Sequence, residues 1–232
     1  MRDRPRAEDL QVLSKVPIFS ALSAEDRAHV LAHARHTVLS ARDVLWLEGQ
    51  KAEHLGIVLS GRLSVVRQQR RRDVIVDVAG PGDVLGEVAL TLGATYQFQV
   101  RCFRRARVLL IPTHTLRTLL ERRPSMAVAL SLDLARQVLR LSRHVEALSA
   151  GGVEQRLARV LVSLTERFGE PFPGGILVPV RLRREDLASL AATTLESASR
   201  HMSSWRKKGW IIQQPSGVLV RDLGAIKRSA EG

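Results

Sequence analysis

Short apolar runs separated by glycine-containing turns dominate the chain between about residue 37 and residue 112. The runs are rich in valine, isoleucine and leucine, and their length suits β-strands. They cover residues 55–59, 63–67, 74–78, 100–102 and 108–111. Turn residues lie between them at Gly49, Gly61, Gly82 and Gly93. Because no helical pattern alternates with these runs, the region is predicted to be an antiparallel sandwich or barrel rather than a doubly wound α/β fold.

Helical spacing replaces this pattern on both sides of the β-rich region. Residues 23–36 are predicted to form a short helix with Ser23 as its N-cap. A longer helix is predicted over residues 124–148, where apolar residues are alternately four and three positions apart. They are Leu134, Val138, Leu141, Val145 and Leu148. This narrow seam favours a parallel two-stranded coiled coil, and hence a homodimer; the alternative is a helix that packs on its own domain.

The C-terminal third of the chain has a different order of elements. Gly151 and Gly152 interrupt the helical pattern and mark a boundary or hinge. Residues 184–210 then show two helical patterns joined by a short turn, and Thr194 is a suitable N-cap for the second. Its inner face is predicted to comprise Leu195, Ala198, Met202 and Trp205. Apolar runs at residues 211–212 and 218–220 predict a β-hairpin, so the whole segment is predicted to be a winged helix-turn-helix.

The opposite face of the second helix carries side chains that can read DNA. An arginine can donate two hydrogen bonds to guanine, and a glutamate can accept one from cytosine. The residues predicted to read bases are Glu196, Ser199 and Arg200. Hydroxyl, lysine and arginine side chains suit phosphate oxygens. The residues predicted to contact phosphates are Thr194, Ser203, Arg206, Lys207 and Lys208. The alternative is a solvated amphipathic helix without a ligand.

The net charge supports a polyanionic partner. The chain has 36 Lys and Arg residues against 23 Asp and Glu residues, a formal charge of +13. Residues 1–100 contribute +1, residues 101–149 contribute +7, and residues 150–232 contribute +5. The excess therefore lies on the segments predicted to mediate dimerisation and DNA binding. The alternative explanation is a composition that is rich in arginine throughout.

The sequence also excludes several classes of protein. A single cysteine, Cys102, excludes an internal disulfide and an iron–sulfur cluster held by cysteines. No apolar run approaches the ~18 residues of a membrane span, and residues 1–10 lack an apolar signal core. We find no P-loop, no nucleophile elbow and no metal-ligand spacing. We therefore expect a cytoplasmic protein that is not an enzyme and whose main partner is double-stranded DNA.

Five short blocks carry a family resemblance that covers nearly the whole chain. They lie at residues 48–50, 56–63, 81–87, 184–188 and 195–200. In their order and separation they resemble the Crp/Fnr family of bacterial transcription regulators. The resemblance implies an α+β fold with a cyclic-nucleotide-binding-like β-roll (jelly roll), a long dimerisation helix and a C-terminal winged helix-turn-helix. It also implies RNA polymerase as a candidate partner.

The resemblance further implies a division into parts and a mode of DNA reading. It places an effector-sensing domain over residues 1–123, a dimerisation helix and hinge over residues 124–150, and a DNA-binding domain over residues 151–232. It also implies that Glu196, Ser199 and Arg200 form an Fnr-type reading head, since the Crp-type head usually has glycine at the position of Ser199. We therefore expect half-sites that resemble TTGAT, arranged as an inverted repeat.

The predicted effector pocket departs from the cyclic-nucleotide-binding members of the family. In those members a Gly-Glu pair binds the ribose, and a following Arg-Ser/Thr-Ala segment grips the cyclic phosphate. Here Gly86 and Glu87 are retained, but Tyr96 stands at the arginine position, with Gln97 and Phe98 after it. A buried phosphate without its arginine is poorly paired. We therefore expect no cyclic AMP binding of the usual kind and interpret Glu87 as part of a structural turn; a ligand contact is the alternative.

The sequence leaves the effector open. Haem is one alternative, since family members that sense nitric oxide or carbon monoxide exist and His29, His33 and His36 lie close together in the sequence. The other interpretation of these histidines is one face of a surface helix. A cyclic nucleotide in an atypical pocket and regulation without any ligand are further alternatives.

Overall fold

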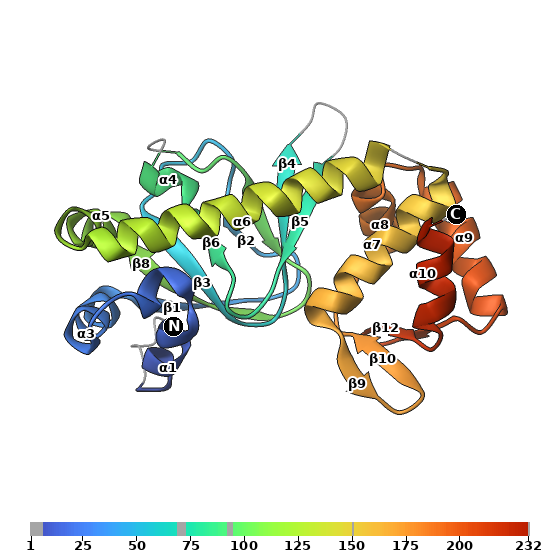
Figure 1. The fold of residues 1–232 in the computed structure, drawn as a ribbon, viewed down its shortest axis with the longest axis horizontal. Coiled ribbons are helices and arrows are strands. Elements are labelled where there is room, and N and C mark those ends of the chain that lie inside the picture. Colours follow the sequence, from blue (N-terminus) through green and yellow to red (C-terminus); the bar gives the residue numbers. More distant parts are fainter. Residues whose placement is uncertain (1–6, 69–72, 92–94, 150, 232) are drawn as a thin grey trace. The chain divides into compact units, whose positions relative to one another are not determined.

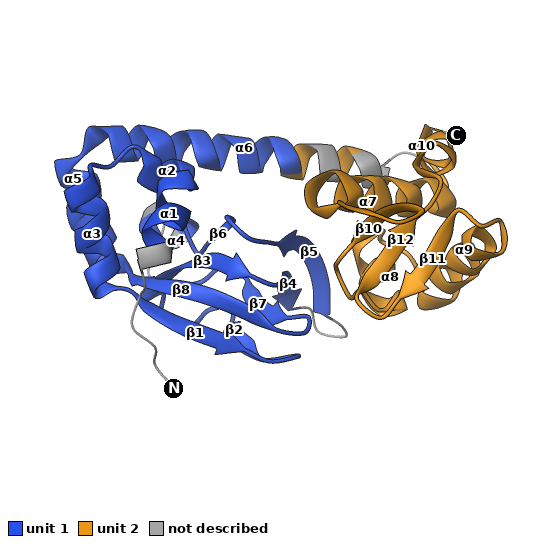
Figure 2. Cartoon of the chain, turned by 90° about the horizontal axis from the view of Figure 1, so that it is seen from below, with its two compact units in different colours: residues 1–140 blue, residues 141–232 orange. Residues whose placement is uncertain are grey.

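The computed structural model describes residues 7–68, 73–91, 95–149 and 151–231. The chain forms two compact units, residues 1–140 and residues 141–232, and their boundary lies within the long helix α6 (Pro124–Ser149) (Figure 2). The finer division into three parts stays a prediction. Within the described ranges, every helix is too short or too polar to cross a bilayer.

Two four-stranded antiparallel sheets form the β-roll of the first unit (Figure 1). In spatial order, the first sheet comprises β1 (Arg35–Leu39), β8 (Ala106–Pro112), β3 (His54–Ser60) and β6 (Val84–Leu85). The second sheet comprises β2 (Val44–Trp46), β7 (Gln99–Cys102), β4 (Leu63–Gln68) and β5 (Asp73–Ala79). The predicted antiparallel architecture is therefore confirmed, together with the five predicted strands. Strands β1, β2 and β6 were not expected from the sequence.

Alternation of side chains along strands β3 and β8 produces two separate apolar cores. Ile57 and Leu109 are paired across the two strands and are buried together with helix residues such as Phe19. Their sequence neighbours Val58 and Val108 belong to the other core, which is built mainly from residues of the two sheets. Each fully buried aliphatic side chain contributes about 1.5–3 kcal/mol. Strands β3 and β8 therefore anchor both the helices and the second sheet.

The remaining helices of the first unit are short. They are α1 (Ala7–Lys15), α2 (Pro17–Ser20), α3 (Ala24–His33), α4 (Val88–Thr91) and α5 (Thr113–Arg122). Ser23 caps α3 as predicted, because its Oγ accepts a hydrogen bond of 3.0 Å from the backbone N–H of Asp26. The helix ends at His33 rather than at residue 36, since the chain enters strand β1 at Arg35.

The second unit combines a four-stranded antiparallel sheet with helices (Figure 1). Its helices are α7 (Val153–Phe168), α8 (Arg184–Leu190), α9 (Leu195–Lys207) and α10 (Leu223–Glu231). Its strands, in spatial order, are β11 (Ile211–Gln214), β12 (Gly217–Val220), β10 (Gly175–Val178) and β9 (Glu170–Phe172). Helices α8 and α9, with the β11–β12 hairpin, form the predicted winged helix-turn-helix. Strand β9 lies where the sequence indicated no regular element.

Candidate DNA-reading helix and effector pocket

One face of helix α9 is embedded in the second unit. Ala198, Met202 and Trp205 are fully buried, as their spacing predicts. The prediction for Leu195 is wrong, because 48% of this side chain is exposed. Leu195 is the first residue of α9, and the buried positions begin one turn later. The apolar spacing of α9 therefore includes one residue, Leu195, that lies before the buried part of the helix.

Both ends of α9 have the predicted capping residues. The Oγ1 atom of Thr194 accepts a hydrogen bond of 3.2 Å from the backbone N–H of Ser197. At the other end, Gly209 has a φ of +75° and donates its N–H to the carbonyl oxygen of Arg206. Glycine adopts this left-handed conformation without the steric cost that a Cβ atom brings. The length of α9 is therefore set by local residues.

The turn before α9 is held from helix α7. Ala192 occupies this turn with a φ of +46°, a conformation that costs a residue with a Cβ atom roughly 1–2 kcal/mol. The Nε of Arg156 donates to the carbonyl oxygen of Ala191 at 3.1 Å, and its Nη2 donates to that of Ala192 at 3.5 Å. These contacts stabilise a turn in which the sequence lacks the usual glycine.

The predicted base-reading residues lie on the outward face of α9. Glu196 and Arg200 are exposed, and Ser199 is half-buried between them. Ser203, predicted to contact phosphate, follows one turn after Ser199 and is also half-buried. Residues three and four positions apart are neighbours on a helix surface. The structure therefore brings Glu196, Ser199 and Arg200 together on the side of α9 that the core leaves accessible.

The basic residues near the end of α9 differ in their surroundings. Arg206 and Lys207 are exposed, whereas the Nζ of Lys208 lies 4.4 Å from the centre of the Trp210 ring, a cation–π distance.

Half-buried Arg184 at the start of α8 was not among the predicted contacts. Burial lowers its guanidinium pKa, and the charge of Arg206 lowers that pKa further. An anion is favoured beside two guanidinium groups of like charge, so Arg184 is an additional phosphate-binding candidate.

In the predicted effector pocket, Tyr96 fills the space beside Gly86. A Cβ atom on Gly86 would lie 3.2 Å from Cε1 of Tyr96. The Tyr96 ring is buried and stacks on Trp46, with ring centres 4.0 Å apart and planes 4° apart. Its hydroxyl donates to the carbonyl oxygen of His54 at 2.8 Å and accepts from the N–H of His54 at 3.2 Å. The side chain at the arginine position is therefore part of the core.

Gln97 and Phe98 lie beside a cation that is already paired. The Nη1 atom of Arg67 donates to the carbonyl oxygen of Gln97 at 2.8 Å and to Oε1 of Glu48 at 3.0 Å. The guanidinium carbon of Arg67 lies 5.3 Å from the centre of the Phe98 ring. The side chain of Gln97 is exposed. Gln97 and Phe98 thus contact the paired Arg67, while Tyr96 lines Gly86.

Glu87 is buried against helix α6. Only 6% of the residue is exposed. Its Oε1 accepts a hydrogen bond of 2.6 Å from Nε2 of Gln137, and its Oε2 has no hydrogen-bond partner within the described part of the chain. Burial raises the pKa of the carboxyl group, and the charge of Asp133 raises it further, while the bond from Gln137 lowers it. Glu87 therefore links the β-roll to α6, as well as ending the turn at Gly86.

Glu87→Gln is expected to stabilise the first unit at neutral pH. The glutamine retains an acceptor for Gln137 and removes the cost of ionising a buried carboxyl group. The pKa of Glu87 is higher in the folded protein than in the unfolded chain. The free energy of unfolding of the wild type therefore falls as the pH rises through the range between these two pKa values. Urea denaturation between pH 4 and pH 8 should show the gain of the variant growing with pH. The exposed Glu53→Gln serves as the control, and a gain that does not depend on pH would contradict this assignment.

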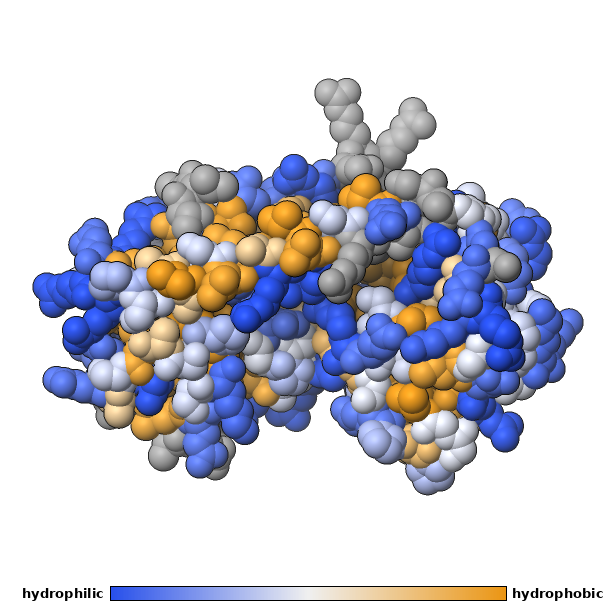
Figure 3. All heavy atoms as spheres, viewed as in Figure 1, coloured by the Kyte–Doolittle hydropathy of each residue, from blue (hydrophilic) through white to orange (hydrophobic). Residues whose placement is uncertain are grey.

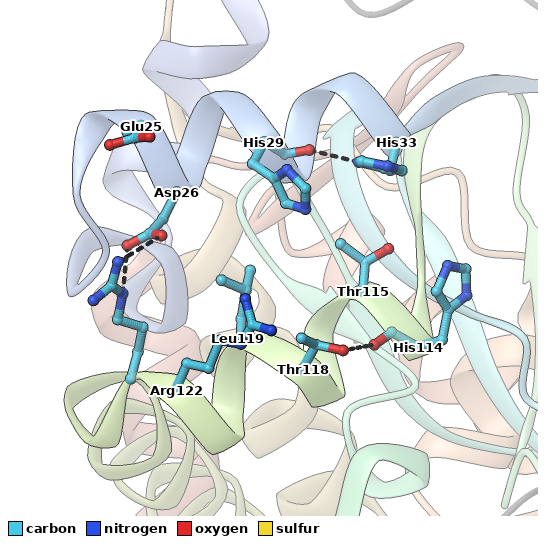
Figure 4. Close-up of a pocket in the computed structure, with 10 residues that line it drawn as sticks. Glu25, Asp26, His29, His33, His114, Thr115, Thr118, Leu119 and Arg122 are labelled. Atoms are coloured by element: carbon cyan, nitrogen blue, oxygen red, sulfur yellow. Dashed lines mark hydrogen bonds and ion pairs between the residues drawn. The ribbon is translucent and has the colours of Figure 1, made fainter.

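The three histidines considered for haem do not form one cluster. His36 is buried in β1, with its Nε2 2.8 Å from Oδ2 of Asp9. His29 and His33 lie on α3, and with His114 of α5 they line a cavity of about 420 Å³ (Figure 4). Among the residues that the structure describes, no group of three His, Cys, Asp or Glu side chains is placed to hold a metal ion. The expected common helix face therefore includes His29 and His33 only.

Cys102 lies in the core between the sheets, as expected for a structural residue. It is buried, and its Sγ lies 3.8 Å from the carbonyl oxygen of Leu39. Burial raises the pKa of the thiol. A buried thiol with a raised pKa is a weak nucleophile, so packing accounts for this residue.

The predicted dimer seam only partly follows the exposed apolar face of α6. Leu134 is half-buried and packs against the core of its own unit. Val138, Leu141 and Val145 are 49–62% exposed, whereas the side chain of Leu148 lies outside the described part. Further exposed apolar residues not expected in the seam are Val128, Leu132 and Leu139. Figure 3 shows apolar side chains gathered along this helix. Exposed apolar residues on α6 thus begin before the predicted seam and include positions outside its row.

Two sequence families match the two structural halves of the chain. Residues 36–123 match the family described as the cyclic nucleotide-binding domain. Residues 155–229 match the family described as the Crp-like helix-turn-helix domain. The first match covers most of the β-roll, and the second covers α8, α9 and the hairpin.

Relatives and solved structures extend the similarity over both halves. The chain is 23% identical over 221 residues to the CRP-like cAMP-activated global transcriptional regulator of Mycobacterium tuberculosis, covering 95% of this chain and 99% of the relative. It is 28% identical over 192 residues to the transcriptional regulator LdrP of Thermus thermophilus, covering 82% and 93% respectively. A solved transcriptional regulator of the CRP family, also from Thermus thermophilus, matches with a TM-score of 0.72 at 25% identity, covering 84% of this chain and 97% of that one.

Proposed function

Because this chain belongs to the Crp/Fnr family of DNA-binding transcription regulators, we propose that it binds an inverted repeat as a homodimer and reads each half-site with α9. The observation that carries this proposal is the two-sided character of α9. Ala198, Met202 and Trp205 anchor one side in the core, and the opposite side presents Glu196, Ser199 and Arg200. RNA polymerase stays a candidate partner of the DNA-bound protein.

We expect the half-sites to resemble TTGAT. In this proposal Arg200 donates to guanine O6 and N7, and Glu196 accepts from the cytosine amino group. The two half-sites should lie about one DNA turn apart, since a two-fold symmetric dimer presents two equivalent helices to one face of the duplex. A band-shift competition between TTGAT-type and TGTGA-type inverted repeats tests the proposal. Equal binding to both, or binding without sequence preference, would contradict it.

Arg200→Ala is expected to relax recognition at one G·C pair at a cost of roughly 1–3 kcal/mol in binding free energy. The exposed guanidinium group is the only part of the side chain that reaches a base edge in this proposal. Titration of wild-type and substituted half-sites by fluorescence anisotropy would measure the loss. Lys207→Ala is the matched control, because a lost phosphate contact should weaken all duplexes equally and reduce the salt dependence of binding. An equal loss on all duplexes for Arg200→Ala would remove it from the reading head.

The phosphate contacts that we propose extend beyond α9. Arg206 and Lys207 are exposed, and Ser203 and Thr194 lie on the same helix or at its start. Arg184 of α8 lies near Arg206. In a complex with DNA, a phosphate between these two guanidinium groups would offset their mutual repulsion. Lys208 contributes charge while it rests on Trp210. Such contacts set the position of α9 on the duplex and carry no sequence information.

We propose that the homodimer forms through the exposed apolar stripe of α6. Val128, Leu132, Val138 and Leu139 are each more than half exposed. Val128, Leu132 and Leu139 lie in one row along the helix, because they are four and seven residues apart. Val138 lies in a second row with Leu141 and Val145, which are also exposed. A second copy of α6 would bury apolar residues of these rows. A coiled coil of this kind presents the same residues from both copies, as a two-fold axis requires.

We propose that the effector pocket does not take cyclic AMP in the manner of the cyclic-nucleotide-binding members. Tyr96 stacks on Trp46 beside Gly86, and Arg67 is already paired with Glu48. Calorimetry with cyclic AMP and cyclic GMP should therefore give a dissociation constant above about 1 mM, weaker than about −4 kcal/mol. Submicromolar binding of either nucleotide would favour the alternative of an atypical cyclic-nucleotide pocket.

A further inference from the structure

Glu154, in the first turn of α7, contacts two side chains of the DNA-reading helix. Its Oε1 accepts a hydrogen bond of 2.8 Å from the indole Nε1 of Trp205. Its Oε2 lies 3.7 Å from Nδ1 of His201. His201 and Trp205 are four residues apart on α9, so they lie one turn from each other on the same side of the helix. A single carboxylate therefore meets α9 at two successive turns, through a hydrogen bond to Trp205 and a close approach to His201.

We propose that Glu154 is a positioning residue that sets the base selectivity of α9. Two contacts at successive turns oppose both rotation of α9 about its axis and translation along it. His201 directly follows Arg200, so a rotation that moves His201 also moves the guanidinium group. An arginine pairs with guanine through two hydrogen bonds of defined direction, and a binding residue must be held within about 0.5 Å and 10–20° of the productive geometry.

The surroundings of Glu154 are compatible with this role in addition to a contribution to stability. Trp205 is fully buried, and Glu154 is the acceptor that satisfies its indole N–H. Glu154 itself is 40% exposed, so its own packing in the core is limited. Two residues later, Arg156 holds the carbonyl oxygens of the turn that precedes α9. The first turn of α7 thus fixes α9 at its entrance through Arg156 and along its length through Glu154.

The test compares Glu154 with a second glutamate of the same helix. Glu166 also lies on α7 and is partly exposed, but its Oε1 pairs with Lys227 of α10 at 3.2 Å. The full-length variants are Glu154→Ala, Glu154→Gln and Glu166→Ala. Each is titrated with the duplex that the wild-type protein selects from a random library and with the same duplex carrying one substituted G·C pair. The ratio of the two affinities measures selectivity.

The inference rests on the proposed DNA-reading role of α9. It does not depend on the expected TTGAT sequence, because the wild-type protein itself selects the duplex used in the test. One substituted pair should weaken wild-type binding roughly 5- to 150-fold. Glu154→Ala should reduce this ratio to about threefold or less, mainly by weaker binding of the selected duplex. Glu154→Gln keeps an acceptor for Trp205 and should restore at least half of the lost selectivity on a logarithmic scale. Glu166→Ala should match the wild type.

The reciprocal variant Trp205→Phe keeps an apolar ring and removes the indole N–H. It should reproduce part of the loss of selectivity, since the contact between Glu154 and His201 remains. Glu154→Ala combined with Trp205→Phe should lose no more than Glu154→Ala alone, because both variants break the same hydrogen bond. If Glu154→Ala folds too poorly for titration, Trp205→Phe alone carries the same test.

Several results would overturn the inference. Glu154→Ala could weaken binding of both duplexes equally, or it could keep the selectivity of the wild type. Glu166→Ala could lose as much selectivity as Glu154→Ala. The losses of selectivity could also be additive in the double variant. If the wild-type protein selects no sequence, the proposed reading function fails first and the inference fails with it.

Discussion

Replacing Leu132 and Leu139 by glutamate is expected to convert the protein from a dimer to a monomer and to lower its affinity for the inverted repeat roughly 10²- to 10⁴-fold. Both side chains are more than half exposed on α6. In the proposed dimer they are buried against a second copy. There the two introduced carboxylates would lose hydration and would be repelled by the same carboxylates of the second copy. A monomer binds only one half-site at a time, so the gain from simultaneous binding of two linked sites is lost.

Two measurements separate this effect from misfolding. Light scattering after size-exclusion chromatography reports the mass of the particle, and titration with full repeats and isolated half-sites reports the loss of avidity. Ala28→Glu with Ala32→Glu is the matched control, because both alanines are exposed on α3 and the variant adds the same charge. The protein with substituted leucines should bind an isolated half-site as the wild type does. A dimer that persists with unchanged affinity for the full repeat would place the interface elsewhere.

Asp9→Ala is expected to lower the free energy of unfolding of the first unit by about 3–5 kcal/mol. Asp9 of α1 and His36 of β1 are 3% and 4% exposed, and their Oδ2 and Nε2 atoms are 2.8 Å apart. Removing one member of this buried pair leaves the other without its partner in a low-dielectric environment. The same pair joins the N-terminal helix to the β-roll, so its loss should also expose α1 to proteolysis.

Urea denaturation of three variants would measure this coupling. Asp9→Ala and His36→Ala should each be strongly destabilising, and the double variant should be less destabilised than the sum of the two. Lys51→Ala is the control, because the pair between Lys51 and Glu53 is exposed and such pairs contribute little. Additive losses in the double variant would show that Asp9 and His36 act separately.

Local spacing was sufficient to predict the elements of the second unit that present α9. The N-cap Thr194, the buried residues Ala198, Met202 and Trp205, and the terminal Gly209 all act within a few residues of their partners. The same holds for the central strands of the β-roll, whose apolar runs are marked by glycine at their ends. The support of the turn at Ala192 by Arg156 could not be predicted in this way. Arg156 is 35 residues from the carbonyl oxygen of Ala191 in the sequence.

Periodic patterns identified helices but did not decide which neighbour each face contacts. The heptad spacing included Leu134, which packs on its own unit, and omitted Leu132 and Leu139, which are exposed. A helical period is the same whether the apolar face meets the core or a second chain, so spacing alone cannot separate the two. His36 was grouped with His29 and His33 by sequence distance, although a change from helix to strand at Arg35 directs it to Asp9.

The sequence by itself determined the family and the winged helix-turn-helix and predicted which residues would read DNA, because these depend on short-range spacing and on residue chemistry. Only the tertiary structure decided which of those residues are held in place and by what. It stacked Tyr96 on Trp46 beside Gly86, buried Glu87 against Gln137 of α6, and joined Glu154 to Trp205 across 51 residues of sequence. Such contacts form between elements that folding brings together, and their energy depends on burial and direction, neither of which a one-dimensional pattern contains.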